Sequence, residues 1–167
     1  ALYAFTSCET AISPLCCVIE DDKPLFTGVS ELLKRSTEHT VDLLRADLHI
    51  QLTELQEQWH FASLEKIFIE QRIYRDIEEA ETWEQVLENI WEGLKPHIGH
   101  LLREITEEDI ARLTEIKIKR ISKFDSAKAD DQITSLEGKI AEVKGHLENL
   151  VEYTIEYFKT LKKKYSA

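Results

Sequence analysis

The chain has 167 residues, with 21 lysines and arginines against 32 acidic residues, so its formal charge is −11 at pH 7. Charged residues make up 32% of it and glycine and proline only 5 and 3 residues, which is typical of a helix-rich protein and excludes collagen, disorder and a disulfide scaffold. The acidity argues against a main role in gripping nucleic-acid phosphates. With no apolar run near the roughly 18 residues of a membrane span and no basic signal-peptide start, we expect a cytoplasmic protein without a membrane partner.

The first 29 residues differ from the rest and predict a short β segment. They begin on Ala1 in a chain that contains no methionine, so we expect an internal piece of a larger protein. An apolar run over residues 15–19, a polar stretch over 20–24 and a second apolar run over 25–27 indicate a small hairpin with a polar turn. The three cysteines of the chain are interpreted as small buried apolar residues in a reducing compartment: Cys8, Cys16 and Cys17.

A long helix is predicted to begin near residue 31, because residues 31–92 contain neither glycine nor proline and Ser30 is a suitable N-cap. Apolar residues three and four apart give this helix one apolar stripe on an otherwise polar surface. The residues of the stripe are Val41, Leu44, Leu48, Leu52, Leu55, Trp59 and Ala62.

Shorter helices are predicted in residues 76–125, which we call the helical head. Thr82 opens a capping box for a helix that Gly93 and Pro96 close, and Thr106 precedes an acidic first turn of a helix that reaches about Lys123. Residues 76–109 carry eleven acidic and two basic side chains, a net charge of −9, whereas residues 112–128 carry +4. The head could therefore be internally paired or could meet a copy of itself.

The last helix is predicted from about Ser126 to Lys163. Its apolar residues follow an a/d heptad pattern, with Gly138 and Gly145 at the outermost f position. Two long helices separated by a compact head can pair only antiparallel. The expected fold is mainly α, a long antiparallel coiled-coil stalk with a small helical head and a short N-terminal β segment. Its segments are residues 1–29 (β segment), 30–75 (outgoing helix), 76–125 (head) and 126–167 (returning helix). The heptad residues are Ile133, Leu136, Ile140, Val143, Leu147, Leu150, Thr154, Tyr157 and Leu161.

Two patterns could bind metal, and each has a plainer interpretation. Glu57 and His60 have the Glu-x-x-His spacing of di-iron carboxylate bundles, but the second motif and the two further acids of such a site are missing. His97, His100 and Glu104 could stand on one face as ligands, but a fourth ligand is missing and a solvated helix end explains the same residues.

No feature of the sequence indicates an active site. Lys162, Lys163 and Lys164 suit the C-terminal turn of a helix, where the dipole favours cations. A phosphate-binding glycine loop, paired catalytic carboxylates and a nucleophile setting are not visible. We therefore assign no catalytic, cofactor-binding or metal-binding residue.

Two stretches of the chain resemble the A subunit of bacterial type IIA DNA topoisomerases, gyrase or topoisomerase IV. The first runs from Leu43-Leu44-Arg45 through Trp59-His60-Phe61-Ala62-Ser63-Leu64-Glu65-Lys66-Ile67-Phe68-Ile69-Glu70, and the second is Arg112-Leu113-Thr114-Glu115-Ile116-Lys117-Ile118-Lys119-Arg120-Ile121-Ser122-Lys123-Phe124. The opening, with Leu2-Tyr3 before a β segment and Ser30-Glu31-Leu32-Leu33 entering a helix, is similar to the end of that subunit's tower region.

The resemblance implies a specific role for the head. In this family an antiparallel coiled coil ends in a helical knob that meets its symmetry mate and forms the exit gate (C-gate), through which the transported DNA duplex leaves during ATP-dependent strand passage. The implied partners are a second copy of the chain, double-stranded DNA and the B subunit, and the implied location is the cytoplasmic nucleoid. ATP and Mg²⁺ belong to the B subunit. The nucleophilic tyrosine lies upstream in the family, so no catalytic residue is carried over; Arg72 and Tyr74 here are separated by Ile73.

Apolar residues on the head-side helices exceed what one short helix can bury, so the isologous dimer contact is expected there. The candidates are Leu113, Ile116, Ile121 and Phe124. Two alternatives remain: a non-enzymatic coiled-coil adaptor that tethers partners, and a metal-carboxylate bundle. Because the acidity is concentrated in the head, we expect the knob to repel a departing duplex rather than hold it.

Overall fold

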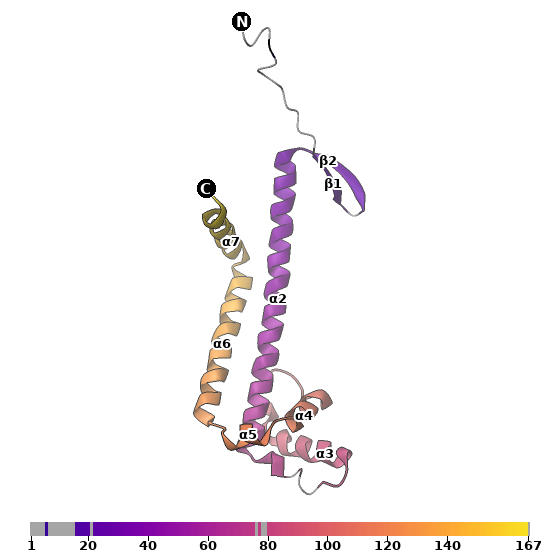
Figure 1. Ribbon diagram of the computed structural model, residues 1–167, viewed down its shortest axis with the longest axis vertical. Helices are drawn as coiled ribbons and strands as arrows, with labels where there is room; N and C mark the ends of the chain where they lie inside the picture. The colour runs from indigo at the N-terminus through magenta and orange to yellow at the C-terminus, as the bar shows by residue number, and fades with distance from the viewer. Residues whose placement is uncertain (1–5, 7–15, 21, 76, 78–79, 167) are drawn as a thin grey trace. The chain divides into compact units, whose positions relative to one another are not determined.

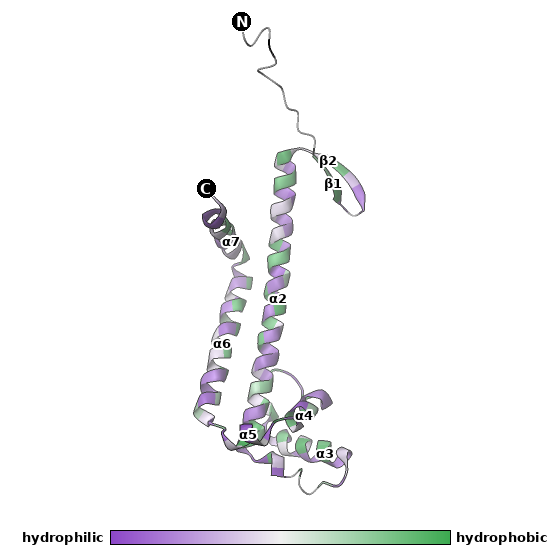
Figure 2. Cartoon of the chain, in the orientation of Figure 1, coloured by the Kyte–Doolittle hydropathy of each residue, from purple (hydrophilic) through white to green (hydrophobic). Residues whose placement is uncertain are grey.

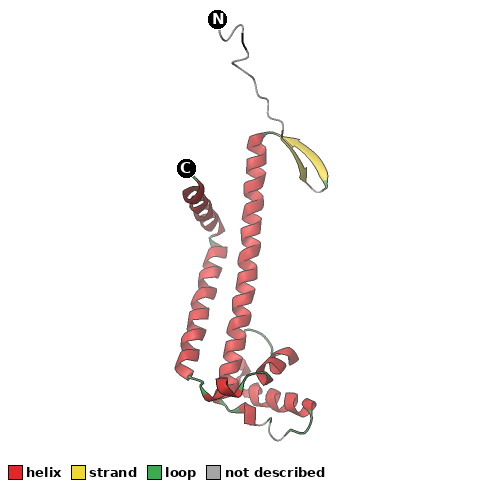
Figure 3. Cartoon of the chain, in the orientation of Figure 1, coloured by secondary structure: helices red, strands yellow, loops and turns green. Residues whose placement is uncertain are grey.

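A computed structural model of the chain describes residues 6, 16–20, 22–75, 77 and 80–166, apart from the side chains of His100 and Ile118. Its contacts divide the chain into two compact units: the hairpin unit, residues 1–46 and 154–167, and the head unit, residues 47–153. Most described residues are helical, and the strands are confined to one N-terminal hairpin (Figures 1 and 3). The predicted mainly α fold with an N-terminal β segment is confirmed. No described helix is long and apolar enough to cross a membrane.

The predicted hairpin is confirmed within the described residues. Strand β1, Cys16–Glu20, pairs antiparallel with β2, Lys23–Thr27. The turn is tighter than predicted, because Lys23 and Pro24 belong to β2, and Asp22 takes the left-handed backbone (φ 61°) that a two-residue turn requires.

The cysteines were predicted to be buried, and this is wrong for those that the structure describes. Cys16 is half-buried and Cys17 is exposed, and both are free thiols. Adjacent residues of a strand point to opposite faces, so a two-stranded hairpin cannot bury both. Cys8 lies outside the described residues.

Helix α2, Val29–Glu70, begins two residues before the predicted start. The amide of Leu32 donates to the carbonyl of Gly28 at 3.0 Å, so Ser30 lies in the first turn and is not the N-cap. The helix ends where Arg72 adopts φ 57°, a left-handed position normally given to glycine. The predicted apolar stripe is confirmed, since all seven of its residues are half-buried or buried.

Within the head unit, helix α6, Ser126–Glu148, runs antiparallel to the second half of α2 (Figure 1). Three cross-helix contacts establish the direction. Ser126 donates to Glu70, Lys66 Nζ donates to Asp130 Oδ1 at 2.5 Å, and Trp59 Nε1 donates to Glu137 Oε1 at 3.1 Å. Hydrophobic and hydrophilic residues alternate along both helices (Figure 2), and the α6 heptad residues Leu136, Ile140 and Val143 are buried.

The returning helix was predicted to be continuous from Ser126 to Lys163, and this is wrong. It is interrupted at Asn149, between α6 and α7, Leu150–Tyr165. The side-chain amide of Asn149 donates to the carbonyl of Gly145 at 3.2 Å, alongside its own backbone amide at 3.0 Å. Asparagine competes with the helix in this way, and Gly145 one turn earlier weakens it further.

The helical head consists of short helices packed on the end of α2. They are α3, Trp83–Leu94, η2, Lys95–His100, α4, Glu107–Thr114, and α5, Ile118–Ser122, and the short helix η1, Ile73–Arg75, precedes them. Thr82 is the N-cap of α3 and Thr106 that of α4, as predicted. The single helix expected up to Lys123 is instead two, because the chain leaves α4 at Glu115 and is extended at Lys117 before α5.

One apolar core joins α2 to the head. Its residues come from the end of α2, from η1 and from the head, where helices α3 and α4 each bury one face in it. Its buried members are Leu64, Phe68, Ile69, Ile73, Val86, Ile90, Leu94, Ile105, Ile110 and Leu113. A Cβ on Gly93 would lie 2.9 Å from Ile73 Cγ2, so this glycine allows α3 to approach η1.

Candidate interaction surface of the helical head

Arg103 lies in the loop before α4 and joins the head to α2. Its guanidinium donates from Nε and Nη2 to the two carboxylate oxygens of Glu57, each at 2.8 Å. It also donates from Nη1 and Nη2 to Asp109 at 2.6 and 2.9 Å. Asp109 in turn forms a capping box with Thr106, accepting from the Thr106 amide at 3.0 Å and from its hydroxyl at 2.9 Å. One arginine therefore binds two carboxylates bidentately and fixes the start of α4.

The ionisation of this network follows from its hydrogen bonds. Burial alone would raise the pKa of Asp109, but the hydrogen bonds from Arg103 and Thr106 outweigh it and hold the pKa well below its ordinary value. The hydrogen bonds of Arg103 lower the pKa of Glu57, and both carboxylates raise the pKa of Arg103. All three groups are charged at neutral pH, so the network is an ion cluster and not a proton-transfer site.

His60 on α2 is fully buried beside this cluster. Its Nε2 lies 3.6 Å from Asp109 Oδ2, beyond hydrogen-bond distance, and neither ring nitrogen has a hydrogen-bond partner. Burial, reinforced by the Arg103 charge, lowers the pKa of His60. The imidazole is therefore neutral at pH 7 and acts as a core residue.

The Glu57 and His60 pattern does not assemble a metal site. Both oxygens of Glu57 are occupied by Arg103, and a cation there would meet the guanidinium charge. No group of three metal-ligating side chains is found in the part of the chain that the structure describes. His97 is half-buried and Glu104 exposed, while the side chain of His100 lies outside the description.

The predicted dimer-contact residues occupy two kinds of position. Leu113 is 1% exposed inside the head's own core, so a partner cannot reach it in this structure. Ile116, Ile121 and Phe124 are half-buried and pack on the outside of the same core, which leaves part of each side chain on the surface. These three are therefore the usable part of the predicted contact, and their role in a dimer stays a prediction.

Sequence reasoning did not single out the exposed tryptophans of α3. Trp83 is 55% exposed and Trp91 38% exposed, although tryptophan is highly buried on average. Trp91 shares a groove with Leu87, Glu84 and Glu88. The eight-residue spacing of Trp83 and Trp91 on an amphipathic helix was the signal available in the sequence. Large aromatic residues are the commonest anchors of protein contacts.

A basic hollow of about 660 Å³ lies between α4, α5 and α2. The Arg112 guanidinium carbon sits 4.3 Å above the ring of Phe61, close enough for a cation–π contact. Arg120 donates to Glu65 from Nη2 at 2.6 Å and thereby ties α5 to α2. The local positive charge predicted after Arg112 is thus concentrated at one hollow.

Comparisons with known proteins identify the family of the chain. The family model for the A subunit of DNA gyrase/topoisomerase IV matches residues 1–159. A relative from Borreliella burgdorferi, named as the A subunit of DNA topoisomerase 4, is 28% identical over 165 residues, 99% of this chain and 26% of the relative. The chain therefore spans about a quarter of the relative it matches. Because the family model covers nearly all of the sequence, the chain belongs to the family of DNA gyrase/topoisomerase IV A subunits.

Proposed function

We propose that the chain forms the dimeric exit gate of a type II DNA topoisomerase, the contact through which a transported duplex leaves after strand passage. The observation that carries the proposal is the family match over residues 1–159. The antiparallel arrangement of α2 and α6 in the head unit supports it, because such a pair carries the helical head at its end. The parent enzyme would be an ATP-dependent isomerase acting on double-stranded DNA in the bacterial cytoplasm.

The head unit suits a contact that must open and close as a body. The Arg103 cluster and the shared apolar core fix the head to α2, so a movement of α2 would carry the head with it. The net charge of −9 over residues 76–109 would repel DNA phosphates, so a duplex arriving at the gate would be released rather than held. The chain's part would be mechanical, with the nucleophilic tyrosine supplied upstream and with ATP and Mg²⁺ held by the B subunit.

The contact is tested by sedimentation equilibrium of the 167-residue chain. We expect a dimer that Ile121→Ala and Phe124→Ala weaken, because both side chains present apolar surface at the head. Leu147→Ala on α6 removes a half-buried apolar residue outside the head and serves as the control. If Leu147→Ala controls association and the head variants do not, the contact is misplaced.

The gate itself is tested in a chimera, in which the chain replaces the matching segment of the Borreliella burgdorferi protein. We expect the chimera, supplied with ATP and its B subunit, to relax supercoiled DNA, and the dimer-weakened variants to relax it more slowly. A chimera that folds and dimerises but neither relaxes nor cleaves DNA would contradict the gate and favour the coiled-coil adaptor.

A further inference from the structure

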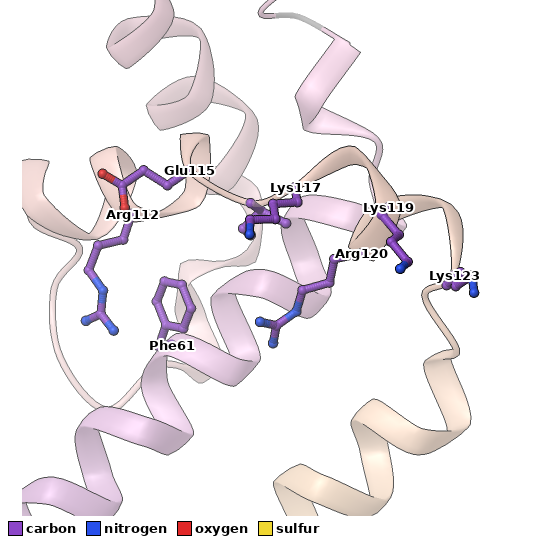
Figure 4. A pocket seen from close by; sticks show the side chains of 8 residues that line it. Phe61, Arg112, Glu115, Lys117, Lys119, Arg120 and Lys123 are labelled. Atoms are coloured by element: carbon purple, nitrogen blue, oxygen red, sulfur yellow. The ribbon is translucent and has the colours of Figure 1, made fainter.

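The basic hollow between α2, α4 and α5 is lined mainly by positively charged side chains, although the chain as a whole is acidic. Figure 4 shows Phe61 of α2 between Arg112 and Arg120, with Lys119 and Lys123 farther along the same rim. Five cations and one carboxylate, Glu115, line the hollow. The chain as a whole has 32 acidic and 21 basic side chains, so acidic side chains that could pair with a lysine or arginine are in excess.

The cations of the hollow differ in what holds them. Arg120 is paired with Glu65, and Arg112 stacks on Phe61. The other three lining cations are Lys117, Lys119 and Lys123, all exposed. No carboxylate within ion-pair distance is found for any of them, or for Arg112, among the residues that the structure describes. Four positive charges without an ion-pair partner among the described residues therefore face one concavity, in which Glu115 is the one lining carboxylate.

We propose that the hollow binds a small anion that carries two or more phosphate groups. Lysine ammonium groups are compact, mobile donors suited to phosphate oxygens, and Arg112 offers a planar donor set held in place by Phe61. Its volume of about 660 Å³ is in the usual range for a small-molecule site. The inference goes beyond the gate function and does not depend on it.

Size and surroundings favour a small anion over a nucleic acid. A duplex carries about one charge per 1.7 Å of its axis, so it would extend past the hollow onto neighbouring surface. The preceding segment, residues 76–109, has a net charge of −9 and would repel those additional phosphates. A small anion within the hollow stays close to the cations, where screening at a Debye length of about 8 Å leaves their attraction largely intact.

The proposal is tested by isothermal titration calorimetry of the 167-residue chain with tripolyphosphate as the probe. We expect saturable 1:1 binding, weakened at least about tenfold when Lys117→Gln and Lys123→Gln are combined, because two of the four unpaired positive charges at the hollow are then lost. The variant carrying Lys162→Gln and Lys163→Gln removes the same charge from α7 and should bind as the unmodified chain does. Orthophosphate should bind at least about tenfold more weakly than tripolyphosphate.

Three results would overturn the proposal. Equal weakening in the α7 variant would mean that net charge alone attracts the anion. Tighter binding of a short DNA duplex than of tripolyphosphate, lost in the Lys117 and Lys123 variant, would assign the hollow to nucleic acid. Absence of tripolyphosphate binding, with self-association reduced by the same two substitutions, would assign it to an acidic protein surface. Tryptophan fluorescence, which reports on Trp59, Trp83 and Trp91, verifies that each variant is folded.

Discussion

The two units of the chain differ in how they bury apolar surface. All fourteen buried hydrophobic residues of the described chain lie in the head unit, and Thr154 is the only buried residue described in the hairpin unit. The hairpin unit instead exposes large apolar side chains, among them Ile19 at 81% and Phe26 at 63%. An isolated two-stranded hairpin is marginally stable, whereas a core of ten buried side chains stabilises itself. The head unit thus has a core of its own, whereas the hairpin unit leaves large apolar side chains exposed to solvent.

The same contrast holds for the ion pairs. Arg103 binds a carboxylate that is 4% exposed, while Arg35 of the hairpin unit pairs with Glu20 and Glu31, whose side chains are about half exposed. Exposed pairs gain little because water screens both charges. Removing one member of a buried pair leaves the other charge buried without a counterion, which lowers the free energy of unfolding. The position of an ion pair, more than its geometry, should therefore decide its contribution.

The largest expected effect is that of Arg103→Met. It leaves the carboxylate of Asp109 buried without its cation and should lower the free energy of unfolding of the head unit by about 3 kcal/mol. Urea unfolding followed by tryptophan fluorescence measures this, because all three tryptophans lie in the head unit. Arg35→Met is the matched control and should leave the midpoint unchanged. Equal effects of the two substitutions would contradict the contrast between the units.

The next largest change in the free energy of unfolding is expected from two helical glycines, Gly93 and Gly138, whose surroundings differ. Gly93→Ala should lower the free energy of unfolding by about 1–2 kcal/mol, because the new methyl group meets Ile73, a core residue that cannot move away. Gly138→Ala, with nothing within 4 Å of its added Cβ, should raise it by roughly 0.5–1 kcal/mol through helix propensity. Urea unfolding measures both. In an Ile73→Ala background the Gly93 substitution should lose its cost, and if it does not, the clash is not the cause.

Much of the fold followed from local patterns in the sequence. Apolar residues three and four apart predicted α2 and α6 with their buried faces, and Thr82 and Thr106 predicted two helix starts. The interruption at Asn149 did not follow, because it depends on a side-chain amide that competes with the helix, and the end of α4 at Glu115 did not follow either. The heptad pattern continues through Asn149, so the pattern alone predicted an unbroken helix.

The candidate site was harder to predict than the fold. Glu57 and His60 carried a pattern of metal chemistry, but their partner, Arg103, lies 46 residues beyond Glu57, and only the tertiary structure brings them together. The positive charge after Arg112 was visible in the sequence, yet its concentration around Phe61 was not. Leu113 was proposed as a contact residue because it is apolar, and no local signal distinguished its core position from the half-buried positions of Ile116 and Ile121.

A smaller effect is expected from pH. The pKa of His60 is lowered by burial, so below the ordinary value of 6.5 the unfolded chain binds a proton more readily than the folded chain. Stability should therefore fall as the pH is lowered from 7 to 5.5. The raised pKa of Glu65 acts in the opposite direction, since the folded chain takes up that proton first. Asp109 and Glu57, with lowered pKa values, add to the loss only below about pH 4.5.

Replacing His60 separates its contribution from that of Glu65. His60→Leu replaces the imidazole with an apolar side chain, and no hydrogen bond is lost because neither imidazole nitrogen has a partner. Its urea-unfolding midpoint should fall less between pH 7 and 5.5 than that of the unmodified chain. His49→Gln removes an exposed imidazole from the same helix and should keep the original pH dependence. A His60→Leu variant with an unaltered pH dependence would show that His60 carries no proton linkage.

The smallest change in the free energy of unfolding is expected from substitutions in the hairpin unit, and it directly tests the contrast in apolar burial between the two units. Ile19→Ser and Phe26→Ser each remove an exposed apolar side chain that contributes nothing to the buried core of the described chain. Since little of either side chain is removed from water, the free energy of unfolding obtained from urea titration followed by tryptophan fluorescence should change by less than about 0.5 kcal/mol. The same substitutions remove exposed apolar surface of the kind that marks an interaction site. In the chimeric topoisomerase they should therefore reduce thermal stability while the isolated chain is unaffected. A large loss in the isolated chain would mean that the hairpin packs on a core that the two-unit division does not include.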